Sequence, residues 1–368
     1  MPEMVRAAVQ TGPRQIEMRE FARPKIGPDD GLLRVEANGI CGSDVEIYRG
    51  HIGDKDRPPF IPGHEPMGII EDVGDRAAER WGVQVGDRVA FEVIVPCRAC
   101  NDCLTGRYQA CTFRKYGHGV TGIEVEPSLW GGFAEHMYIS PNSVLHKIDK
   151  TLPVAVAAMY NPLGAGVRWA VDLGEVSLGD TLVVLGAGQR GLAAVIAAKS
   201  VGASNIIITG LAGDAHKLAI ARELGADHTV IVGEGGQDIV EAVTEITNGR
   251  MADVSLDLTP MAAGPVTDAM KVVRHGGRVV LAGLKGHREI PLVTDLIINR
   301  ALTVKGAFGV DASANRRAIQ LLESGRFPFE KLHTHTFGLD EVGLAIDTLA
   351  GDTEDKSAIH VSVHPSFA

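Results

Sequence analysis

The chain has 368 residues, of which 45% are hydrophobic and 22% are charged, so it can bury a full core but is too long for one ordinary domain. The net charge of −10 is spread along the sequence without a basic stripe, which argues against nucleic acid as a partner. The 44 glycines, against only 5% aromatic residues, favour an α/β protein with many turns. We therefore expect two domains and small-molecule chemistry.

Neither the start of the chain nor its longest apolar run predicts a membrane or export segment. The first twelve residues contain no cationic segment followed by an apolar core, which a secretory signal would need. The longest apolar run, residues 181–198, is interrupted by Gln189 and Arg190 and contains a glycine turn, so it does not predict a membrane span. The sequence thus predicts a cytoplasmic protein with no membrane partner.

Short strands are expected over residues 31–40, 67–74 and 86–93, between Gly, Asp and Pro turns, and together they indicate a β-rich domain. Cys41 and His64 lie on separate turns within this region. A thiolate and an imidazole can be two of the three protein ligands of a catalytic zinc site, which keeps one position open. Taken alone, such a pair is more often a buried thiol and a structural histidine.

Four of the five cysteines follow the spacing C-x2-C-x2-C-x7-C; they are Cys97, Cys100, Cys103 and Cys111. An odd cysteine count without an export signal fits reduced thiols, and clustering at short spacing fits metal thiolates better than disulfides. Four thiolates close a tetrahedral zinc site, so the lobe at about 95–113 is predicted to be structural. The alternatives are four free thiols or an iron–sulfur cluster, but a ferredoxin run has a last gap of three residues followed by Pro, whereas here Thr112 follows.

A glycine turn follows the predicted strand at 181–185. Gly186, Gly188 and Gly191 have the spacing G-x-G-x-x-G, and an Ala-rich helix and a second buried strand at 205–210 come next. This order suits dinucleotide binding, because the glycines allow a tight turn, close approach of a pyrophosphate and helix packing. Gln189 and Arg190, inside the turn, are then expected cofactor contacts. The alternative is a tight glycine turn in an α/β domain without a ligand.

Further apolar runs at 228–232, 252–258, 276–284 and 301–308 alternate with helical patterns. This alternation predicts a doubly wound parallel sheet across roughly 155–305. The end of the chain predicts helices over 316–327 and 339–351 and a closing strand over 358–364.

In combination these motifs resemble the zinc-dependent medium-chain dehydrogenases, which include alcohol, polyol, threonine and glucose dehydrogenases. The segments GICGSD, PGHE, VGDRV, the four-cysteine lobe, GGFAEH, LGAGQRG and LGADHTV occur in the family's order. The resemblance implies an α/β chain whose Rossmann domain, a doubly wound parallel sheet at 156–305, is inserted in a β-rich GroES-like catalytic domain formed by 1–155 and 306–368. It also implies a homodimer or homotetramer.

The resemblance makes Cys41 and His64 ligands of a catalytic zinc. It places Glu65 near the metal as a neighbouring or exchanging carboxylate. Asp44 is expected to orient the ligand histidine, and Ser43 to hydrogen-bond the substrate oxygen and pass its proton outward. Without the motif, capping of turns would explain Ser43 and Asp44.

Two positions depart from the family's pattern. Where many relatives carry a relay histidine, this chain has Glu46, which could accept a proton through water if burial raised its pKa, or could be a solvated surface residue. His51 and His118 are the spare candidates for the relay. Where relatives supply a third zinc ligand as Cys or Glu before Pro-Leu, this chain has Asn161.

For the catalytic metal, we expect Cys41, His64 and Glu65 as ligands with Asn161 beside them. An amide oxygen is a weaker zinc donor than a thiolate or carboxylate. Coordination by Asn161 itself, or a site without metal, are the alternatives.

Cofactor choice depends on the end of the second strand, where an acidic residue would hold the ribose hydroxyls of NAD. The chain has Gly210 there, so no carboxylate repels a 2′-phosphate. His216 or Lys217 could approach that phosphate, and Asp214 could hold the ribose instead. We therefore expect use of both NAD and NADP.

The sequence thus predicts an NAD(P)-dependent zinc alcohol dehydrogenase that acts on a secondary alcohol or polyol, with reversible carbonyl reduction. Zinc would act as a Lewis acid that lowers the pKa of the alcohol while the nicotinamide accepts hydride. The alternatives are a zinc-free enoyl- or quinone-type reductase on the same scaffold and a non-catalytic nucleotide-binding protein. The sequence does not identify the alcohol.

Overall fold

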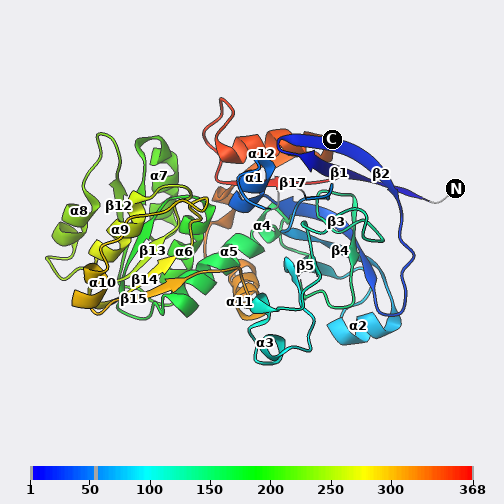
Figure 1. Cartoon of the computed structure of the whole chain (residues 1–368), viewed down its shortest axis with the longest axis horizontal. Coiled ribbons are helices and arrows are strands. Elements are labelled where there is room, and N and C mark those ends of the chain that lie inside the picture. Colours follow the sequence, from blue (N-terminus) through cyan, green and yellow to red (C-terminus); the bar gives the residue numbers. More distant parts are fainter. Residues whose placement is uncertain (1–2, 54–56, 367–368) are drawn as a thin grey trace. The chain divides into compact units, whose positions relative to one another are not determined.

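In the computed structural model, which describes residues 3–53 and 57–366, the chain forms two compact units (Figure 1). The first unit contains the chain up to Asn161 together with Leu322–Ser324 and His333–Ala368. The second unit contains Pro162–Leu321 and Gly325–Leu332. The chain therefore forms most of the first unit, then the second, and returns to the first.

The first unit is built on a seven-stranded, mostly antiparallel sheet. In spatial order its strands are β16 (His333–Phe337), β17 (His360–Val363), β3 (Gly31–Gly39), β4 (Pro66–Val73), β5 (Arg88–Phe91) and β9 (Leu145–Lys147), while β8 (His136–Ile139) also pairs with β3. The predicted strands at 31–40, 67–74, 86–93 and 358–364 are confirmed as β3, β4, β5 and β17. Strand β16, which the sequence did not predict, pairs with β17 in parallel.

Two smaller strand pairs complete the β structure of this unit: the hairpin of β1 (Met4–Gly12) and β2 (Gln15–Ala22), and the pair of β6 (Ile94–Val95) and β7 (Tyr116–Gly117). Its helices are α1 (Gly42–Tyr48), α2 (Asp75–Trp81), α3 (Asn101–Leu104), α4 (Val154–Ala157) and α12 (Val342–Ala350). Apolar residues of β3, β4, β5 and β8 form one core cluster, and α1, α12 and β17 share another.

The second unit contains a parallel six-stranded sheet in the order β12-β11-β10-β13-β14-β15. Its strands are β10 (Thr181–Leu185), β11 (Asn205–Gly210), β12 (His228–Ile231), β13 (Ala252–Asp257), β14 (Val273–Leu281) and β15 (Thr303–Gly306). The strand order reverses between β10 and β13, as in a doubly wound dinucleotide-binding sheet. The predicted sheet is confirmed, strand by strand.

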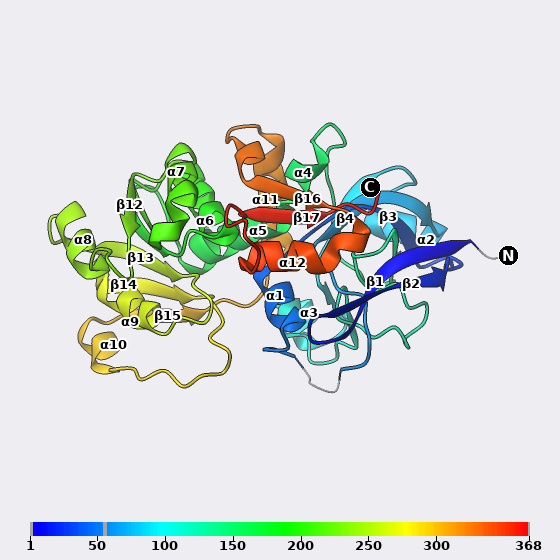
Figure 2. The same cartoon turned by 90° about the horizontal axis from the view of Figure 1, so that it is seen from above.

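Helices cover this sheet, so that its central strands are buried as a parallel sheet requires. They are α6 (Gln189–Ser200), α7 (Ala215–Glu223), α8 (Ile239–Ile246), α9 (Gly264–Lys271) and α10 (Asp295–Asn299). Figure 2 shows α6 and α7 on one side of the sheet and α9 on the other. All residues of β10 and β13 are buried, and Val183, Ile207 and Val279 belong to one core cluster.

Two further helices lie where the chain passes from one unit to the other: α5 (Tyr160–Gly166), which continues as a π-helix over Val167–Leu173, and α11 (Ala312–Glu323). The predicted helices at 316–327 and 339–351 are confirmed as α11 and α12. Within residues 3–53 and 57–366, none of the helices has the length and hydropathy that crossing a bilayer requires.

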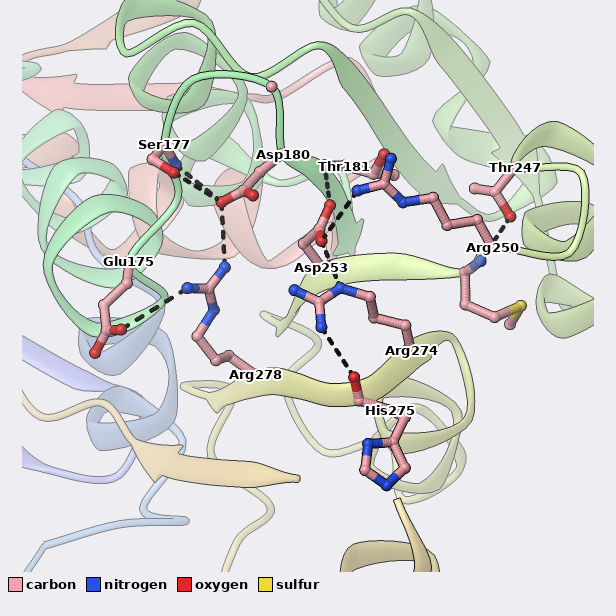
Figure 3. Close-up of polar contacts among 12 residues, drawn as sticks. Glu175, Ser177, Asp180, Thr181, Thr247, Arg250, Asp253, Arg274, His275 and Arg278 are labelled. Carbon is pink, nitrogen blue, oxygen red and sulfur yellow. Dashed lines mark hydrogen bonds and ion pairs between the residues drawn. The ribbon is translucent and has the colours of Figure 1, made fainter. Parts of the chain in front are cut away.

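A polar network links the amino ends of three strands of the second unit (Figure 3). Asp253 of β13 is buried and accepts hydrogen bonds from the backbone N–H of Thr181 at 2.8 Å and from Nε of Arg274 at 2.6 Å. Nearby, Arg278 of β14 donates to Asp180 at 3.1 Å. The network therefore joins the starts of β10, β13 and β14.

Candidate metal and nucleotide sites

Cys41 is held at the start of α1 by a reciprocal cap. Its backbone is extended, with φ −91° and ψ 156°, and its Sγ accepts from the backbone N–H of Ser43 at 3.4 Å. Oδ2 of Asp44 in turn accepts from the backbone N–H of Cys41 at 2.9 Å. This capping arrangement, normal at a helix start, fixes the positions of both the thiol and the Asp44 carboxylate.

His64 follows a turn that requires glycine. Gly63 has φ +85°, and a Cβ there would lie 2.8 Å from the backbone N of Phe133. Nδ1 of His64 is 2.9 Å from Oδ1 of Asp44, so the carboxylate fixes the ring with Nε2 as the ligand atom. Burial alone would lower the pKa of His64, but Asp44 and Cys41 outweigh it and raise that pKa well above its usual value. Metal binding at Nε2 therefore releases a proton.

Cys41, His64 and Glu65 form one buried donor cluster. One ligand atom from each lies within 4.8 Å of the other two, and Glu65 has no exposed surface. Thiolate, imidazole and carboxylate are the donors that zinc prefers, and three of them leave a fourth position open for substrate. The donor set thus fits a catalytic zinc. Asn161, the second residue of α5, is also buried in this unit.

Ser43 lies beside this cluster. Its hydroxyl donates to Sγ of Cys41 at 3.0 Å and is 3.2 Å from Nε2 of His64. The hydroxyl is therefore next to the two donors that would hold a metal, where a substrate oxygen would also bind.

Of the relay candidates, Glu46 and His51 contact each other, whereas His118 contacts Ser143. Glu46 is 7% exposed, and its Oε2 is 2.8 Å from Nδ1 of the half-exposed His51. The alternative that Glu46 is a solvated surface residue is therefore wrong. His118 has no exposed surface, and its Nε2 is 3.0 Å from Oγ of Ser143. Burial lowers the pKa of His118 to about 4, so it is a neutral core residue.

The sulfur atoms of the four cysteines in the lobe lie close enough together to bind a single metal ion. Sγ separations are 3.8 Å for Cys97 and Cys103, 3.4 Å for Cys100 and Cys103, and 3.9 Å for Cys100 and Cys111. Four sulfurs around a tetrahedral zinc at its normal bond length are about 3.8 Å apart. Backbone N–H groups of Ala99 and Cys100 lower the pKa of Cys97 to about 6, which favours the thiolate. The lobe fits a closed, structural zinc site.

The three glycines of the turn after β10 each meet a separate need. Gly186 has φ +109°, which L side chains rarely adopt. A Cβ on Gly191 would lie 2.0 Å from the carbonyl oxygen of Gly186, so only glycine lets α6 pack there. A Cβ on Gly188 would meet nothing within 4 Å, so its backbone is open to a ligand. Beside the turn, the Arg190 guanidinium stacks 5.1 Å from the Trp169 ring.

The region that would receive the ribose lies after Gly210, the last residue of β11. Asp214 accepts from the backbone N–H of Leu211 at 3.0 Å and from Nζ of Lys217 at 2.8 Å. Burial, which raises the pKa of Asp214, is outweighed by Lys217 and this N–H, so that pKa is lowered. His216 is half-buried on the next turn. The region thus presents one carboxylate and one ammonium that already neutralise each other.

Comparison with known proteins decides the family. Residues 27–150 match the family described as alcohol dehydrogenase GroES-like domain, and residues 191–324 match the one described as zinc-binding dehydrogenase. A probable alcohol dehydrogenase of Mycobacterium tuberculosis is 42% identical over 98% of this chain and 99% of its own length. The chain belongs to the zinc-binding medium-chain dehydrogenases. Its resemblance to that family is therefore confirmed, as are the GroES-like catalytic domain and the α/β class.

Two more members of the family extend the comparison. The erythritol/L-threitol dehydrogenase of Mycolicibacterium smegmatis is 33% identical over 100% of this chain and 99% of its own length. The crystal structure of a putative zinc-binding dehydrogenase from Sinorhizobium meliloti, bound to NADP, has a TM-score of 0.85 at 28% identity and covers 99% of this chain and 100% of its own. The fold of the Sinorhizobium protein therefore matches that of this chain over nearly the full length of both.

Sequence reasoning missed two residues beside the donor cluster, Gly39 and His360. A Cβ on Gly39 would lie 2.9 Å from Oε2 of Glu65 and 3.3 Å from Nε2 of His360. Gly39 begins the segment GICGSD, but no motif relates it to His360, because what brings the two together is the pairing of β17 with β3 across more than three hundred residues of chain.

Proposed function

We propose that the protein is an NAD(P)-dependent dehydrogenase of secondary alcohols or polyols, with one catalytic and one structural zinc. The observation that carries this proposal is the buried donor cluster of Cys41, His64 and Glu65, with Asp44 on the far nitrogen of the histidine. A zinc-free reductase on the same scaffold would need none of these ligands. Membership of the family and the open glycine turn after β10 support the nucleotide cofactor.

Each cofactor supplies one part of the chemistry: zinc lowers the pKa of the substrate hydroxyl as a Lewis acid, and NAD(P)⁺ accepts hydride from the carbinol carbon. The chain's own residues orient and deprotonate the substrate. Oδ1 of Asp44 lies 2.9 Å from Nδ1 of His64 and so holds the ring with its Nε2 toward Cys41 and Glu65. The Ser43 hydroxyl would accept the hydroxyl proton of the alcohol while passing its own proton outward, so that loss of one proton and one hydride leaves the carbonyl.

The proton then has to leave a buried site. Glu46 is buried, and its carboxylate contacts the half-exposed His51 at 2.8 Å. We assign the outward end of the relay to this pair, in place of the single relay histidine of many relatives. If the pair carries the proton, Glu46→Gln slows alcohol oxidation, because an amide cannot accept the proton as a carboxylate does.

For the metal we propose Cys41, His64 and Glu65 as ligands, with Asn161 beside them to bind water or a substrate hydroxyl. Four cysteines, Cys97, Cys100, Cys103 and Cys111, would hold the structural zinc. The dinucleotide would lie on Gly186, Gly188, Gln189, Arg190 and Gly191, with Gly210, His216 and Lys217 at its ribose. A polyol is the favoured substrate class, because relatives at 33% identity are named erythritol/L-threitol and sorbitol dehydrogenases.

We also propose that the protein works as a homodimer or homotetramer in the cytoplasm, and that its catalytic domain comprises 1–155 and 306–368. Strand β15 ends the sheet of the second unit and pairs with β14 alone among the described strands. Val293 and Ile298, on nearby segments in the sequence, are 65% and 71% exposed. An edge strand with exposed apolar neighbours is a surface that a second copy would cover.

A substrate panel tests the function. Secondary alcohols, four- to six-carbon polyols and aromatic alcohols are offered with NAD⁺ and with NADP⁺ to protein of measured zinc content. We expect polyol-dependent reduction of the cofactor that disappears in Cys41→Ala and persists in a control, Arg250→Ala, whose side chain is 68% exposed. Reduction of enones by zinc-depleted protein would favour the zinc-free reductase. Binding of nucleotide with no turnover of either substrate class would favour a non-catalytic protein.

A further inference from the structure

Gly39 and His360, which are both buried, lie beside Glu65. β17 pairs with β3 where Ser362 faces Gly39, and the backbone N–H of Gly39 donates to the carbonyl of Glu65 at 3.2 Å. A Cβ on Gly39 would lie 2.9 Å from Oε2 of Glu65 and 3.3 Å from Nε2 of His360. The carboxylate and the imidazole therefore approach the same point beside residue 39, where a side chain would collide with Oε2.

The Nε2 atom of His360 is buried without a hydrogen-bond partner in the described residues. The residue as a whole is 1% exposed. Buried polar atoms are nearly always paired with protein or water. The other polar atoms near the same point beside Gly39 are Oε2 of Glu65 and the carbonyl oxygen of Ala158, at 2.9 and 3.4 Å from a Cβ placed on Gly39.

The other side of His360 is fixed by a second histidine. His333 and His360 are register partners on β16 and β17, with their Nδ1 atoms 2.9 Å apart. Nε2 of His333 is 2.8 Å from Oγ1 of Thr336. Burial lowers the pKa of His333 to about 4 and holds the pKa of His360 well below its usual value.

The two rings form a hydrogen bond through their Nδ1 atoms, so one Nδ1 carries the proton and the other accepts it. If Thr336 donates to Nε2 of His333, then His333 donates from Nδ1 to His360, and His360 carries its proton on Nε2. This tautomer places an N–H toward the Glu65 carboxylate, whereas the opposite one would place a lone pair there. The electrostatics of the carboxylate therefore favour the donor form.

We propose that His360 is a positioning residue for Glu65. Its Nε2–H binds one carboxylate oxygen through one water beside Gly39, and thereby aims the other oxygen at the donor cluster with Cys41 and His64. This inference rests on the proposed function, because it requires zinc in that cluster. Hydrogen bonds to ligating carboxylates typically change metal affinity by about 10–100-fold.

Zinc competition on the full-length protein tests the proposal. A chromophoric chelator measures the affinity of the donor cluster in wild type, His360→Leu and His360→Gln, with the zinc of the four-cysteine lobe as an internal reference. We expect His360→Leu to weaken zinc binding about 10–100-fold. His360→Gln, which keeps an N–H at the same distance from the backbone, should stay within about threefold of wild type if the outer hydrogen bond is what matters.

The matched control is His335→Gln, on the neighbouring strand β16, because His335 contacts Asp355 at 2.9 Å and the adjacent Thr334 instead of Glu65. Its zinc affinity should equal that of wild type. If His360→Leu fails to fold, Gly39→Ala gives the second readout: its methyl group would displace the Glu65 carboxylate and should cause a similar loss.

Wild-type zinc affinity in His360→Leu or in Gly39→Ala overturns the proposal, and so does an equal loss in the Leu and Gln variants, since that would mean only packing matters. Failure of the proposed function is distinct from these outcomes. In that case wild-type protein itself would bind no zinc at this cluster, or would oxidise no alcohol.

Discussion

Asn161 stands where relatives of this chain supply a third zinc ligand. The chemistry of the donor atoms predicts that Glu65, and not Asn161, takes that role. A neutral amide is a weaker zinc donor than the buried carboxylate of Glu65. We expect Glu65→Gln to weaken catalytic zinc binding by more than about tenfold. Asn161→Ala should keep one zinc in the cluster and instead raise KM for the alcohol. Equilibrium dialysis with zinc analysis checks this, and the opposite order of the two variants would make Asn161 the third ligand.

Gly210 carries the second prediction at this scale. Because β11 ends without a carboxylate, and because Asp214 is held by Lys217, we expect weak discrimination against the 2′-phosphate. We expect kcat/KM for NAD⁺ and NADP⁺ to differ by less than about a hundredfold, or ~2.7 kcal/mol. Gly210→Asp should shift the ratio toward NAD⁺ by more than about tenfold, ~1.4 kcal/mol.

The control for added bulk in this loop is Gly213→Ala, since a Cβ there meets nothing within 4 Å. It should leave the cofactor ratio unchanged. A wild-type preference for NAD⁺ above a hundredfold would show that another group, such as Asp214, already excludes the phosphate.

How much of the site the sequence could predict depends on whether its residues are close in the chain. Cys41, Ser43 and Asp44 lie within one helical turn, and the contacts expected of them by resemblance, such as Asp44 to His64 at 2.9 Å, are present. Gly39 and His360 were not predicted. Their contact with Glu65 depends on which strand lies beside β3, and local sequence does not specify the neighbours of a strand in an antiparallel sheet.

Among the elements, the network at the amino ends of β10, β13 and β14 predicts a stability effect (Figure 3). Asp253 is 1% exposed and accepts from Thr181 and Arg274. We expect Asp253→Asn to lower the free energy of unfolding by about 1–3 kcal/mol, because charged hydrogen bonds at a buried group are lost. Urea unfolding followed by circular dichroism measures this.

The control is Arg250→Ala. Arg250 is as far as 3.7 Å from Oδ1 of Asp253, and its side chain is 68% exposed. Its loss should therefore change stability by less than about 1 kcal/mol. Equal effects of the two variants would mean that long-range charge, and not the buried contacts, makes the network stabilising.

The pKa of Asp253 gives this prediction a pH dependence. Burial raises that pKa, but the Thr181 N–H and Arg274 outweigh it, so the pKa in the folded protein is lowered. The contribution is therefore complete above the unfolded pKa of about 4 and is lost as the pH falls through the lower folded value. The difference in stability between wild type and Asp253→Asn should persist at pH 7 and shrink as the pH falls below about 4.

The central strands of the second unit could be predicted one by one because the middle of a parallel sheet is buried on both faces, so each of these strands is an apolar run. The residues of β10, TLVVL, are all buried. Strand β16, with the sequence HTHTF, has intermediate burial and no apolar alternation, so nothing local distinguishes it from a loop. Strands β6 and β7 have two residues each, too few for any pattern.

For the whole molecule, the two proposed zinc sites should differ in how firmly they hold the metal. Four cysteines surround the lobe site, whereas the donor cluster offers three protein ligands and an open position. We expect about two zinc ions per chain. Mild chelation should remove one of them together with dehydrogenase activity, and leave the thermal unfolding temperature nearly unchanged.

The lobe zinc should behave in the opposite way, since binding of a structural zinc is itself folding free energy. Cys100→Ser should therefore lower the unfolding temperature and the yield of assembled protein before it affects turnover per correctly folded chain. Zinc analysis, differential scanning calorimetry and activity are measured on the same samples through the chelation series. A fully active enzyme with a single, tightly held zinc would contradict the assignment, because activity would then be independent of metal at Cys41. Loss of both zincs in one step, with unfolding, would instead mean that the catalytic cluster is as firmly closed as the lobe.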